Sequence, residues 1–170
     1  MNDSSFPPAS AQVTALKDFA RSELFERTFG EGMELVEETA AYLDGAGRKE
    51  SKMLSRNAAL AYAGESMRLT TRLMQVASWL LVQRAVREGD MAVQEAAQDR
   101  YRVREEKAGE GRAEPAEPLP HGLLDLLERS SRLHERVLHL DRRMYLSALE
   151  GEAENPVQSQ LDRLRSAFGG

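Results

Sequence analysis

The chain has 170 residues, of which 41% are hydrophobic and 30% are charged, and its formal net charge is −5. This length fits one domain with tails, large enough to bury roughly 70% of the surface of the unfolded chain. The acidic balance argues against non-specific nucleic-acid binding, and the absence of cysteine excludes disulfides, a thiol nucleophile and zinc–thiolate sites. Alanine, leucine, glutamate and arginine outnumber the β-branched residues, which predicts an all-α protein.

The N-terminal residues and the apolar runs predict neither a signal peptide nor a membrane span. Residues 1–10 are polar and contain Pro7-Pro8, so we interpret them as a disordered tail. The longest apolar stretch, Val76–Val82, is interrupted by Ser78 and is far shorter than the roughly 20 residues that a membrane helix needs. We therefore expect a cytoplasmic protein that does not contact the membrane.

The first helix is predicted from about Ala11 to Leu43, where apolar residues recur at steps of three or four. Gly30 and Gly32 fall inside this pattern, and we interpret them as a bend or a close contact between helices. Gly45 is expected to end the helix. The apolar stripe consists of Phe25, Phe29, Met33, Val36, Ala40 and Leu43.

The second helix, from about Lys49 to Glu88, is apolar over an unusually wide arc. A helix that is apolar nearly all round is normally buried nearly all round, so part of its burial is expected to come from a second subunit in a homodimer. Its main stripe is Tyr62, Ser66, Leu69, Leu73, Val76 and Leu80; a second is Met67, Met74, Leu81 and Ala85; a third face holds Arg68, Arg72, Gln75, Trp79 and Val86.

The chain after Gly89 is predicted to be less regular. Asp90 is expected to cap a polar helix that runs from Met91 to about Lys107. Residues 108–120 are rich in glycine, proline and glutamate and are interpreted as a mobile linker. The prediction is therefore one bundle domain over residues 11–150, with this linker inside it.

The last bundle helix is predicted from about Gly122 to Leu149, with Gly151 as its stop. Its apolar residues alternate steps of four and three, a heptad-like seam that suits antiparallel packing. Residues 151–170 are expected to form a flexible tail that carries a short amphipathic helix beginning at Asn155-Pro156. The apolar stripe of that tail is Val157, Leu161, Leu164 and Phe168.

Charge divides unevenly between the first two predicted helices. Residues 17–44 carry three basic and eight acidic groups, whereas residues 48–88 carry eight basic and three acidic groups. One interpretation is that neighbouring helices complement each other. The alternative is that part of the basic face meets an acidic partner, which would make binding sensitive to salt.

No pattern of catalytic or metal-binding residues is evident, so we expect neither an enzyme nor a cofactor. His134 and His139 are five residues apart and point to different faces of a helix, and no Glu-x-x-His motif of a di-iron bundle occurs. Trp79 with nearby arginines could stack and pair with RNA, but the acidic balance opposes that reading. Tryptophan and arginine are typical of protein-binding hot spots, which favours a protein-interaction face of Arg68, Arg72, Gln75 and Trp79.

Two sequence blocks resemble a known family. Glu31–Lys49 reads EGMELVEETAAYLDGAGRK, and Tyr62–Gly89 reads YAGESMRLTTRLMQVASWLLVQRAVREG. Both are similar to the alphaproteobacterial RcdA family, regulators of the degradation of the cell-cycle transcription factor CtrA. The resemblance covers the first two predicted helices, and it is weaker over residues 90–150 and in the tails.

The resemblance implies a three-helix bundle that forms a homodimer and has a flexible C-terminal tail. It also implies a protease adaptor, which tethers substrates such as a CtrA-like transcription factor to the ClpXP protease primed by the response regulator CpdR. The cyclic-di-GMP-binding protein PopA is a further implied partner. On this hypothesis the tail residues Leu161, Leu164 and Phe168 dock in a partner groove. The alternative is a self-associating scaffold protein without a protease link.

Overall fold

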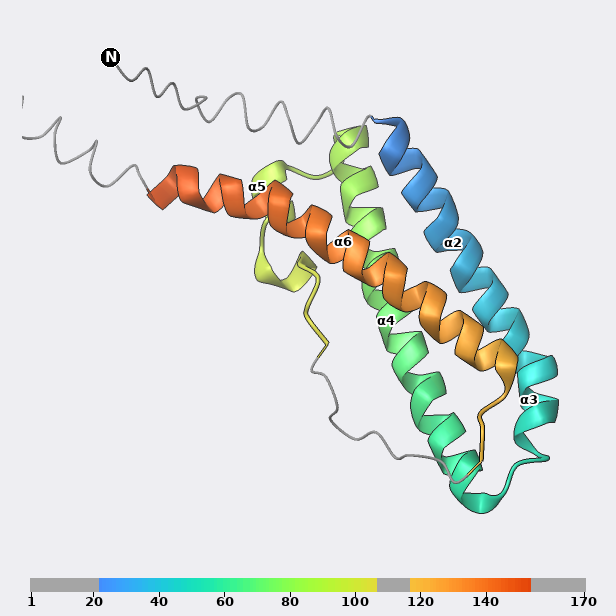
Figure 1. The fold of residues 1–170 in the computed structure, drawn as a ribbon. Coiled ribbons are helices and arrows are strands. Elements are labelled where there is room, and N and C mark those ends of the chain that lie inside the picture. Colours follow the sequence, from blue (N-terminus) through green and yellow to red (C-terminus); the bar gives the residue numbers. More distant parts are fainter. Residues whose placement is uncertain (1–21, 107–116, 154–170) are drawn as a thin grey trace, which may run out of the picture.

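The computed structural model describes residues 22–106 and 117–153, the last of these (146–153) by their backbone alone. Within these ranges the regular structure is helical, which confirms the predicted all-α class. Three long helices form the bundle, and shorter ones connect them (Figure 1). The elements are α2 (Glu23–Asp44), α3 (Ala46–Ser51), α4 (Arg56–Glu88), α5 (Val93–Ala96), the 3-10 helix η1 (Asp99–Tyr101) and α6 (His121–Ala153).

Cap residues explain where the first two long helices begin and end. Ser22 accepts a hydrogen bond from the amide of Phe25 (3.3 Å) at the start of α2, and Ser55 accepts one from Ala58 (3.3 Å) at the start of α4. Gly45 ends α2, as predicted. Gly89 ends α4 in the left-handed conformation (φ 83°), which glycine adopts without steric cost.

The three long helices pack in two directions. Helix α2 runs antiparallel to both others, whereas α6 crosses α4 in a roughly parallel sense (Figure 1). The predicted antiparallel packing of the last helix is therefore right for α2 and wrong for α4, since α6 and α4 begin at the same end of the bundle. The side-chain pairs that show these directions are Glu31–Arg136 and Glu38–Arg129 between α2 and α6, and Arg72–Ser130, Trp79–Asp141 and Gln83–Tyr145 between α4 and α6.

The core lies where the three helices meet. Gly32 is buried at this point, and a Cβ atom there would lie 2.6 Å from the Cδ1 of Leu80. The prediction of a close helix contact is thus confirmed for Gly32, whereas Gly30 is exposed and has nothing within 4 Å of that position. The core residues from the main predicted stripes include Phe25, Leu69, Leu73, Val76, Leu80, Leu126, Leu133 and Val137. In α2 the prediction missed Leu35, which is buried, and included Ala40, which is exposed.

Four predicted boundaries differ from the structure. The second helix does not run unbroken from Lys49, because Ser55 caps a new helix after the short α3. Asp90 is not a cap, since Ala92 precedes α5. The polar helix predicted over residues 91–107 is replaced by the short helices α5 and η1. Their partly buried apolar residues pack against the bundle. Helix α6 continues past Gly151, because glycine lowers helix stability without preventing a helix.

The charge division between the first two helices is resolved mostly within the chain. The acidic residues of α2 pair with α6 through Glu31–Arg136 (2.8 Å) and Glu38–Arg129 (2.6 Å). Glu26 also pairs with Arg87 of α4. The acidic face of α2 therefore forms more of its ion pairs with α6 than with the basic helix α4.

Parts of the predicted domain plan lie outside the described residues. These are the N-terminal tail 1–10, most of the linker 108–120, and the tail helix with Leu161, Leu164 and Phe168. Over the ranges that the structure does describe, none of the helices is both long and apolar enough for a membrane span.

Candidate protein-interaction surface

Trp79 lies inside the bundle and not on its surface. Its side chain is only 1% exposed, and its indole N–H donates to Asp141 Oδ1 of α6 (2.9 Å). Arg102 donates to the same carboxylate through Nε (2.9 Å), and its guanidinium lies 4.7 Å from the ring centre of Tyr145. The expected contact between Trp79 and a partner is therefore replaced by one within the chain.

Burial sets the electrostatics of this cluster. Loss of hydration raises the pKa of Asp141 above its usual range, although the hydrogen bond from Trp79 and the charge of Arg102 act in the opposite direction. Burial likewise raises the pKa of Tyr145, whose hydroxyl bonds to Gln83. The cluster thus joins α4, α6 and residues 99–106 through buried polar contacts. We call residues 99–106 the connecting segment.

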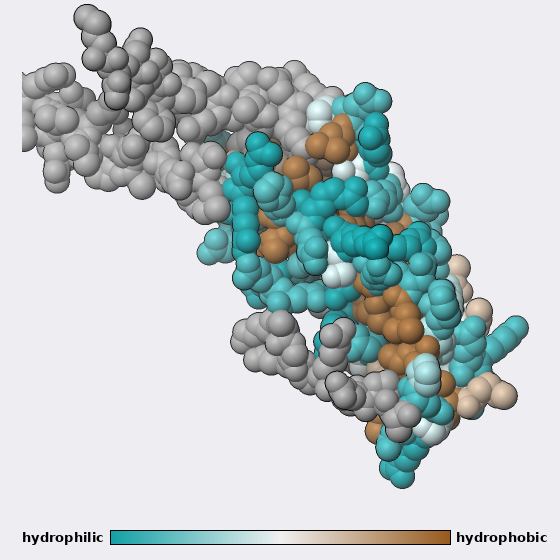
Figure 2. All heavy atoms as spheres, in the orientation of Figure 1, coloured by the Kyte–Doolittle hydropathy of each residue, from teal (hydrophilic) through white to brown (hydrophobic). Residues whose placement is uncertain are grey.

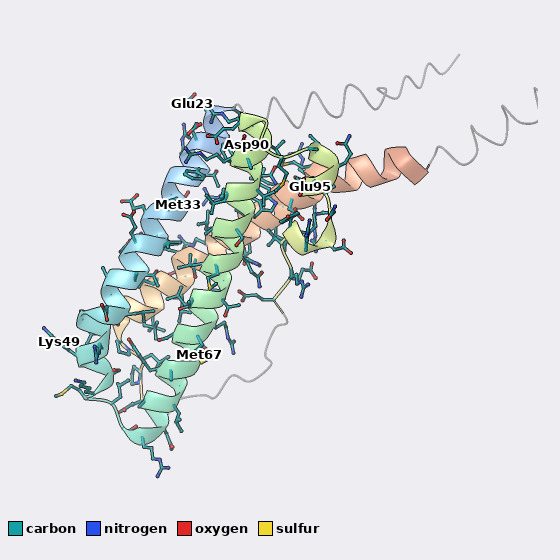
Figure 3. All side chains as sticks on the ribbon, turned by 180° about the vertical axis from the view of Figure 1, so that it is seen from behind. Glu23, Met33, Lys49, Met67, Asp90 and Glu95 are labelled. Carbon is teal, nitrogen blue, oxygen red and sulfur yellow. The ribbon has the colours of Figure 1, made fainter. Side chains whose placement is uncertain are left out.

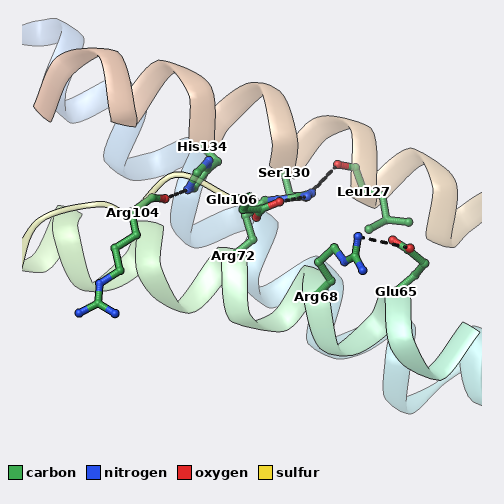
Figure 4. A network of polar contacts seen from close by, with 8 residues as sticks. All are labelled: Glu65, Arg68, Arg72, Arg104, Glu106, Leu127, Ser130 and His134. Carbon is green, nitrogen blue, oxygen red and sulfur yellow. Dashed lines mark hydrogen bonds and ion pairs between the residues drawn. The ribbon is translucent and has the colours of Figure 1, made fainter. Parts of the chain in front are cut away.

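Arg72 is also buried, being 7% exposed, and it connects three parts of the chain (Figure 4). It forms a bidentate ion pair with Glu106, with N–O distances of 2.6 and 2.7 Å. Its remaining nitrogen donates to Ser130 Oγ (2.8 Å) and to the carbonyl of Leu127 (3.0 Å) in α6. Hydrogen bonds from Arg72 lower the pKa of Glu106. Arg72 is therefore committed to the fold, which leaves it unavailable to a partner in this structure.

The other two predicted residues on this face are partly accessible. Arg68 is half-buried and lies 3.8 Å from Glu65, one turn earlier on α4. Gln75 is also half-buried, and its Oε1 is buried without a hydrogen-bond partner among the described residues. A partner role for Arg68 and Gln75 stays a prediction.

His134 fastens the connecting segment to α6. Its Nε2 lies 3.1 Å from the carbonyl oxygen of Arg104, to which it can donate (Figure 4). Burial lowers the pKa of His134, partly offset by the nearby carboxylate of Glu106. A neutral imidazole in this position therefore favours the folded state.

The accessible apolar surface lies on the opposite side of α4. Leu60, Met67, Met74 and Leu81 are spaced by seven residues, and we call them the α4 seam. At about 100° per residue, the seam points away from the buried stripe. Figure 3 shows α4 from that side, with Met67 labelled and no helix in front of it. The exposed fractions are 65% for Leu60, 72% for Met67, 65% for Met74 and 52% for Leu81.

The residues beside the seam are small and uncharged. Ala63, Gly64, Thr70, Thr71, Ala77 and Ser78 flank it. The charged residues of α4 between Leu60 and Leu81 are Glu65, Arg68 and Arg72, all on its bundle-facing side. The seam thus gives an uncharged helix face about 32 Å long, at about 1.5 Å per residue.

The opposite view of the molecule looks different. The face in Figure 2 is largely hydrophilic where it is coloured, with smaller hydrophobic patches in its upper half and a larger one in its lower half. Solvent-exposed helices normally carry charges on their outer face, and contiguous exposed apolar stripes commonly mark contacts with other proteins. The α4 seam therefore has the chemistry of a protein-binding face.

No constellation for metal chemistry occurs in the part of the chain that the structure describes. There, no group of three or more histidine, aspartate or glutamate side chains is placed to hold a metal ion. The buried carboxylate of Asp141 and the more accessible one of Glu106 are both engaged by arginines of the same chain.

Comparison with known proteins decides the family. Residues 16–168 match the family described as Protein of unknown function (DUF1465). The structure is similar to the crystal structure of RcdA from Caulobacter crescentus CB15, with 68% sequence identity and a TM-score of 0.64, and the match covers 76% of this chain and 98% of that chain. The chain belongs to the RcdA family. Among curated proteins, none matches this sequence.

The seam is visible in the sequence, but the sequence pattern favours another face of the helix as the interaction surface. Met67, Met74 and Leu81 formed the second predicted stripe, and Leu60 extends it by one heptad. The sequence favours Trp79 and Arg72 because tryptophan and arginine dominate binding hot spots. The same residue types also satisfy buried positions when an acidic partner lies opposite, as Asp141 and Glu106 do here.

Proposed function

We propose that this chain is an adaptor of regulated proteolysis. In this proposal it tethers substrates, such as a CtrA-like transcription factor, to the ClpXP protease primed by the response regulator CpdR, and it also binds PopA. The observation that carries the proposal is the 68% identity to RcdA over 98% of that chain. The chain itself catalyses no reaction and needs no cofactor, and it acts in the cytoplasm.

The physical basis of such a function is local concentration. A tether that holds a substrate beside the protease raises its effective concentration to roughly millimolar without new chemistry. An adaptor therefore needs separate surfaces for different partners. The bundle supplies one such surface in the α4 seam. The tail residues Leu161, Leu164 and Phe168 are proposed as a second docking element, in agreement with the amphipathic pattern of the sequence.

We further propose that the α4 seam pairs with a second copy of the chain. A heptad-spaced ridge flanked by small residues is suited to pack against its own copy across a twofold axis, because each ridge can lie against the small residues of the other. A stable interface needs about 800 Å² from each partner, and a helix face about 32 Å long with adjoining residues can supply an area of that order.

Reconstituted degradation tests the adaptor role. Purified ClpXP, the primed response regulator and a CtrA-like substrate are incubated with ATP, with and without this chain, and substrate loss is followed on gels. We expect faster loss with the chain present, and a chain lacking residues 155–170 should fail to recruit the protease complex while keeping its helical circular dichroism. An unchanged rate with the full chain would refute the adaptor function.

The α4 seam also favours a second candidate, a self-associating scaffold without a protease link. That function requires the dimer and no protease partner. A pull-down from cells that recovers only the chain itself would support the scaffold. Recovery of protease, response regulator and transcription factor, lost with residues 155–170, would support the adaptor.

A further inference from the structure

A groove runs between α4 on one side and η1 with the residues that follow it on the other. Its volume is about 480 Å³, which is within the range of ligand-binding clefts. Met74 and Val82 of α4 give it an apolar side, and Arg100, Arg102 and Arg104 line it from the connecting segment. Three arginines and no acidic residue line the groove, although the chain as a whole is acidic.

The three arginines differ in what already holds them. Arg102 is bound to the buried carboxylate of Asp141. Arg100 lies 3.7 Å from Glu95, a loose and exposed pair, and it stacks 4.6 Å from the ring centre of Tyr101. Arg104 is held by its backbone carbonyl, while its side chain points away from the polar network (Figure 4). Among the described residues, the guanidinium of Arg104 makes no hydrogen bond or ion pair.

Two further features of the groove indicate a ligand with a backbone and an apolar side chain. Gln75 lines it with a buried Oε1 that accepts no hydrogen bond from the described residues. A buried acceptor without a donor costs free energy, which an incoming N–H group would recover once the Gln75 side chain turns toward the groove. Met74 is 65% exposed, and a flexible thioether adapts to different apolar partners.

We propose that this groove binds an acidic peptide segment of a partner protein. Carboxylates of the peptide pair with Arg104 and Arg100, because a guanidinium matches a carboxylate with two parallel hydrogen bonds. An apolar side chain of the peptide packs on Met74, which is also part of the α4 seam, so a peptide in the groove and a second copy of the chain compete for this residue. The inference deepens the proposed adaptor function, and it rests on that function only in assigning the peptide to a delivered substrate.

A nucleic-acid ligand fits the groove less well. Polyanion binding draws on many phosphate contacts and on a field of positive charge, whereas the net charge here is −5. The groove also presents an apolar side formed by Met74 and Val82, which a phosphate backbone cannot use. An acidic and apolar peptide uses both kinds of surface.

Fluorescence anisotropy with the full chain tests the proposal directly. The probe is a labelled short peptide in which glutamate alternates with leucine, and its analogue carries glutamine in place of glutamate. We expect the glutamate peptide to bind, less tightly at high salt, and the glutamine analogue to bind at least about tenfold more weakly. Equal binding of the two peptides would overturn the proposal.

Two arginine variants locate the site. Arg104→Ala should weaken peptide binding about tenfold, which corresponds to about 1.4 kcal/mol. Arg56→Ala removes the same charge from the first residue of α4, outside the groove lining, and should leave binding within about twofold of the wild type. Equal losses in both variants would mean general charge attraction and would overturn the groove. A labelled oligonucleotide that binds more tightly than the peptide and is lost in Arg104→Ala would do the same.

The reconstituted degradation reaction separates this inference from the adaptor function. If the wild-type chain delivers substrate and Arg104→Ala does so equally well, the groove does not hold substrate, although the adaptor function stands. If the wild-type chain delivers nothing, the adaptor function fails, and peptide binding still decides whether the groove recognises acidic segments. Slower delivery by Arg104→Ala, with Arg56→Ala unaffected, supports the groove.

Discussion

Trp79 of α4 and Asp141 of α6 are joined by a buried hydrogen bond of 2.9 Å, and the same carboxylate binds Arg102 of the connecting segment. One side chain thus satisfies an indole N–H and a guanidinium that would otherwise be buried without partners. Buried polar groups cost free energy when they lack hydrogen bonds, so the three residues form one unit. This unit ties α6 and the connecting segment to α4.

Removal of the carboxylate should therefore destabilise the protein strongly. In Asp141→Ala, Arg102 loses its ion pair and Trp79 its acceptor, and we expect a loss of about 3–5 kcal/mol in the free energy of unfolding. Asp141→Asn keeps an acceptor and should lose less. Urea unfolding followed by circular dichroism measures both. The control is Asp125→Ala, which removes an exposed pair with Arg129 and should cost less than about 1 kcal/mol.

The long helices could be predicted from the sequence because their periodicity and caps agree. Gly45, Gly89 and the buried stripe through Leu69, Val76 and Leu80 lie where the pattern placed them. The 91–107 region could not be predicted, because its short-range pattern is weak and its conformation is set by contacts distant in sequence. Arg72–Glu106 is separated by 34 residues and Arg102–Asp141 by 39.

The burial of Trp79 and Arg72 could not be predicted from the sequence either. Helical periodicity placed them beside the main stripe, but the arc covered by α6 depends on the crossing of the two helices, which periodicity does not specify. The seam residues Met67 and Met74 were identified as a stripe, and only the packing shows that this stripe is the exposed one.

The ion pair between Arg72 and Glu106 should hold the connecting segment in place. Glu106→Gln replaces a charged, two-pronged pair with a weaker hydrogen bond, so residues 102–106 should open more often. Hydrogen exchange with mass spectrometric detection should show faster exchange there and unchanged protection in α2. Glu105→Gln removes the exposed pair with Arg142 and is the matched control. Similar exchange in both variants would contradict this role of Arg72.

His134 should make stability depend on pH. Burial holds its pKa in the folded state below that in the unfolded state, so the unfolded chain binds the proton first as pH falls. His134 therefore contributes full stability above about pH 6.5, and that contribution is lost as pH falls from there through the pKa of the folded state. Urea midpoints at about pH 7.5 and about pH 5.5 measure the loss.

The variant His134→Gln keeps a donor for the carbonyl of Arg104 but does not titrate. It should lose less stability between the two pH values than the wild type. His139→Gln, at an exposed position of the same helix, should keep the wild-type dependence. A pH dependence that is identical in all three proteins would assign it to other groups, such as Glu106 and Glu38, whose pKa values arginine hydrogen bonds lower in the folded state.

Two glycine-to-alanine substitutions should have opposite effects. At Gly47 a Cβ atom would lie 2.6 Å from the hydroxyl of Tyr62 and 2.9 Å from the carbonyl oxygen of Tyr42, so Gly47→Ala should cost about 1–3 kcal/mol by overpacking. At Gly30 the space is open, and Gly30→Ala should add about 0.5–1 kcal/mol through helix propensity. Urea unfolding of the two variants compares them directly, and a gain from Gly47→Ala would mean that α3 moves freely on α2.

The α4 seam gives the prediction closest to function. Met67→Glu puts a charge in the middle of the proposed interface between two copies, where it would be desolvated, and should weaken self-association by about 2 kcal/mol, or about thirtyfold. Met67 is 72% exposed, so the fold of one chain should be unaffected. Sedimentation over a range of concentrations measures the association, and circular dichroism checks the fold.

Met53→Glu is the matched control for the seam. Met53 is 87% exposed in the turn between α3 and α4, so it carries the same change of side chain outside the seam. It should sediment as the wild type does. If Met67→Glu also sediments as the wild type, the seam does not join two copies of the chain. Its uncharged surface would then be available to a partner protein in the adaptor complex, because an apolar helix face of this length is normally covered.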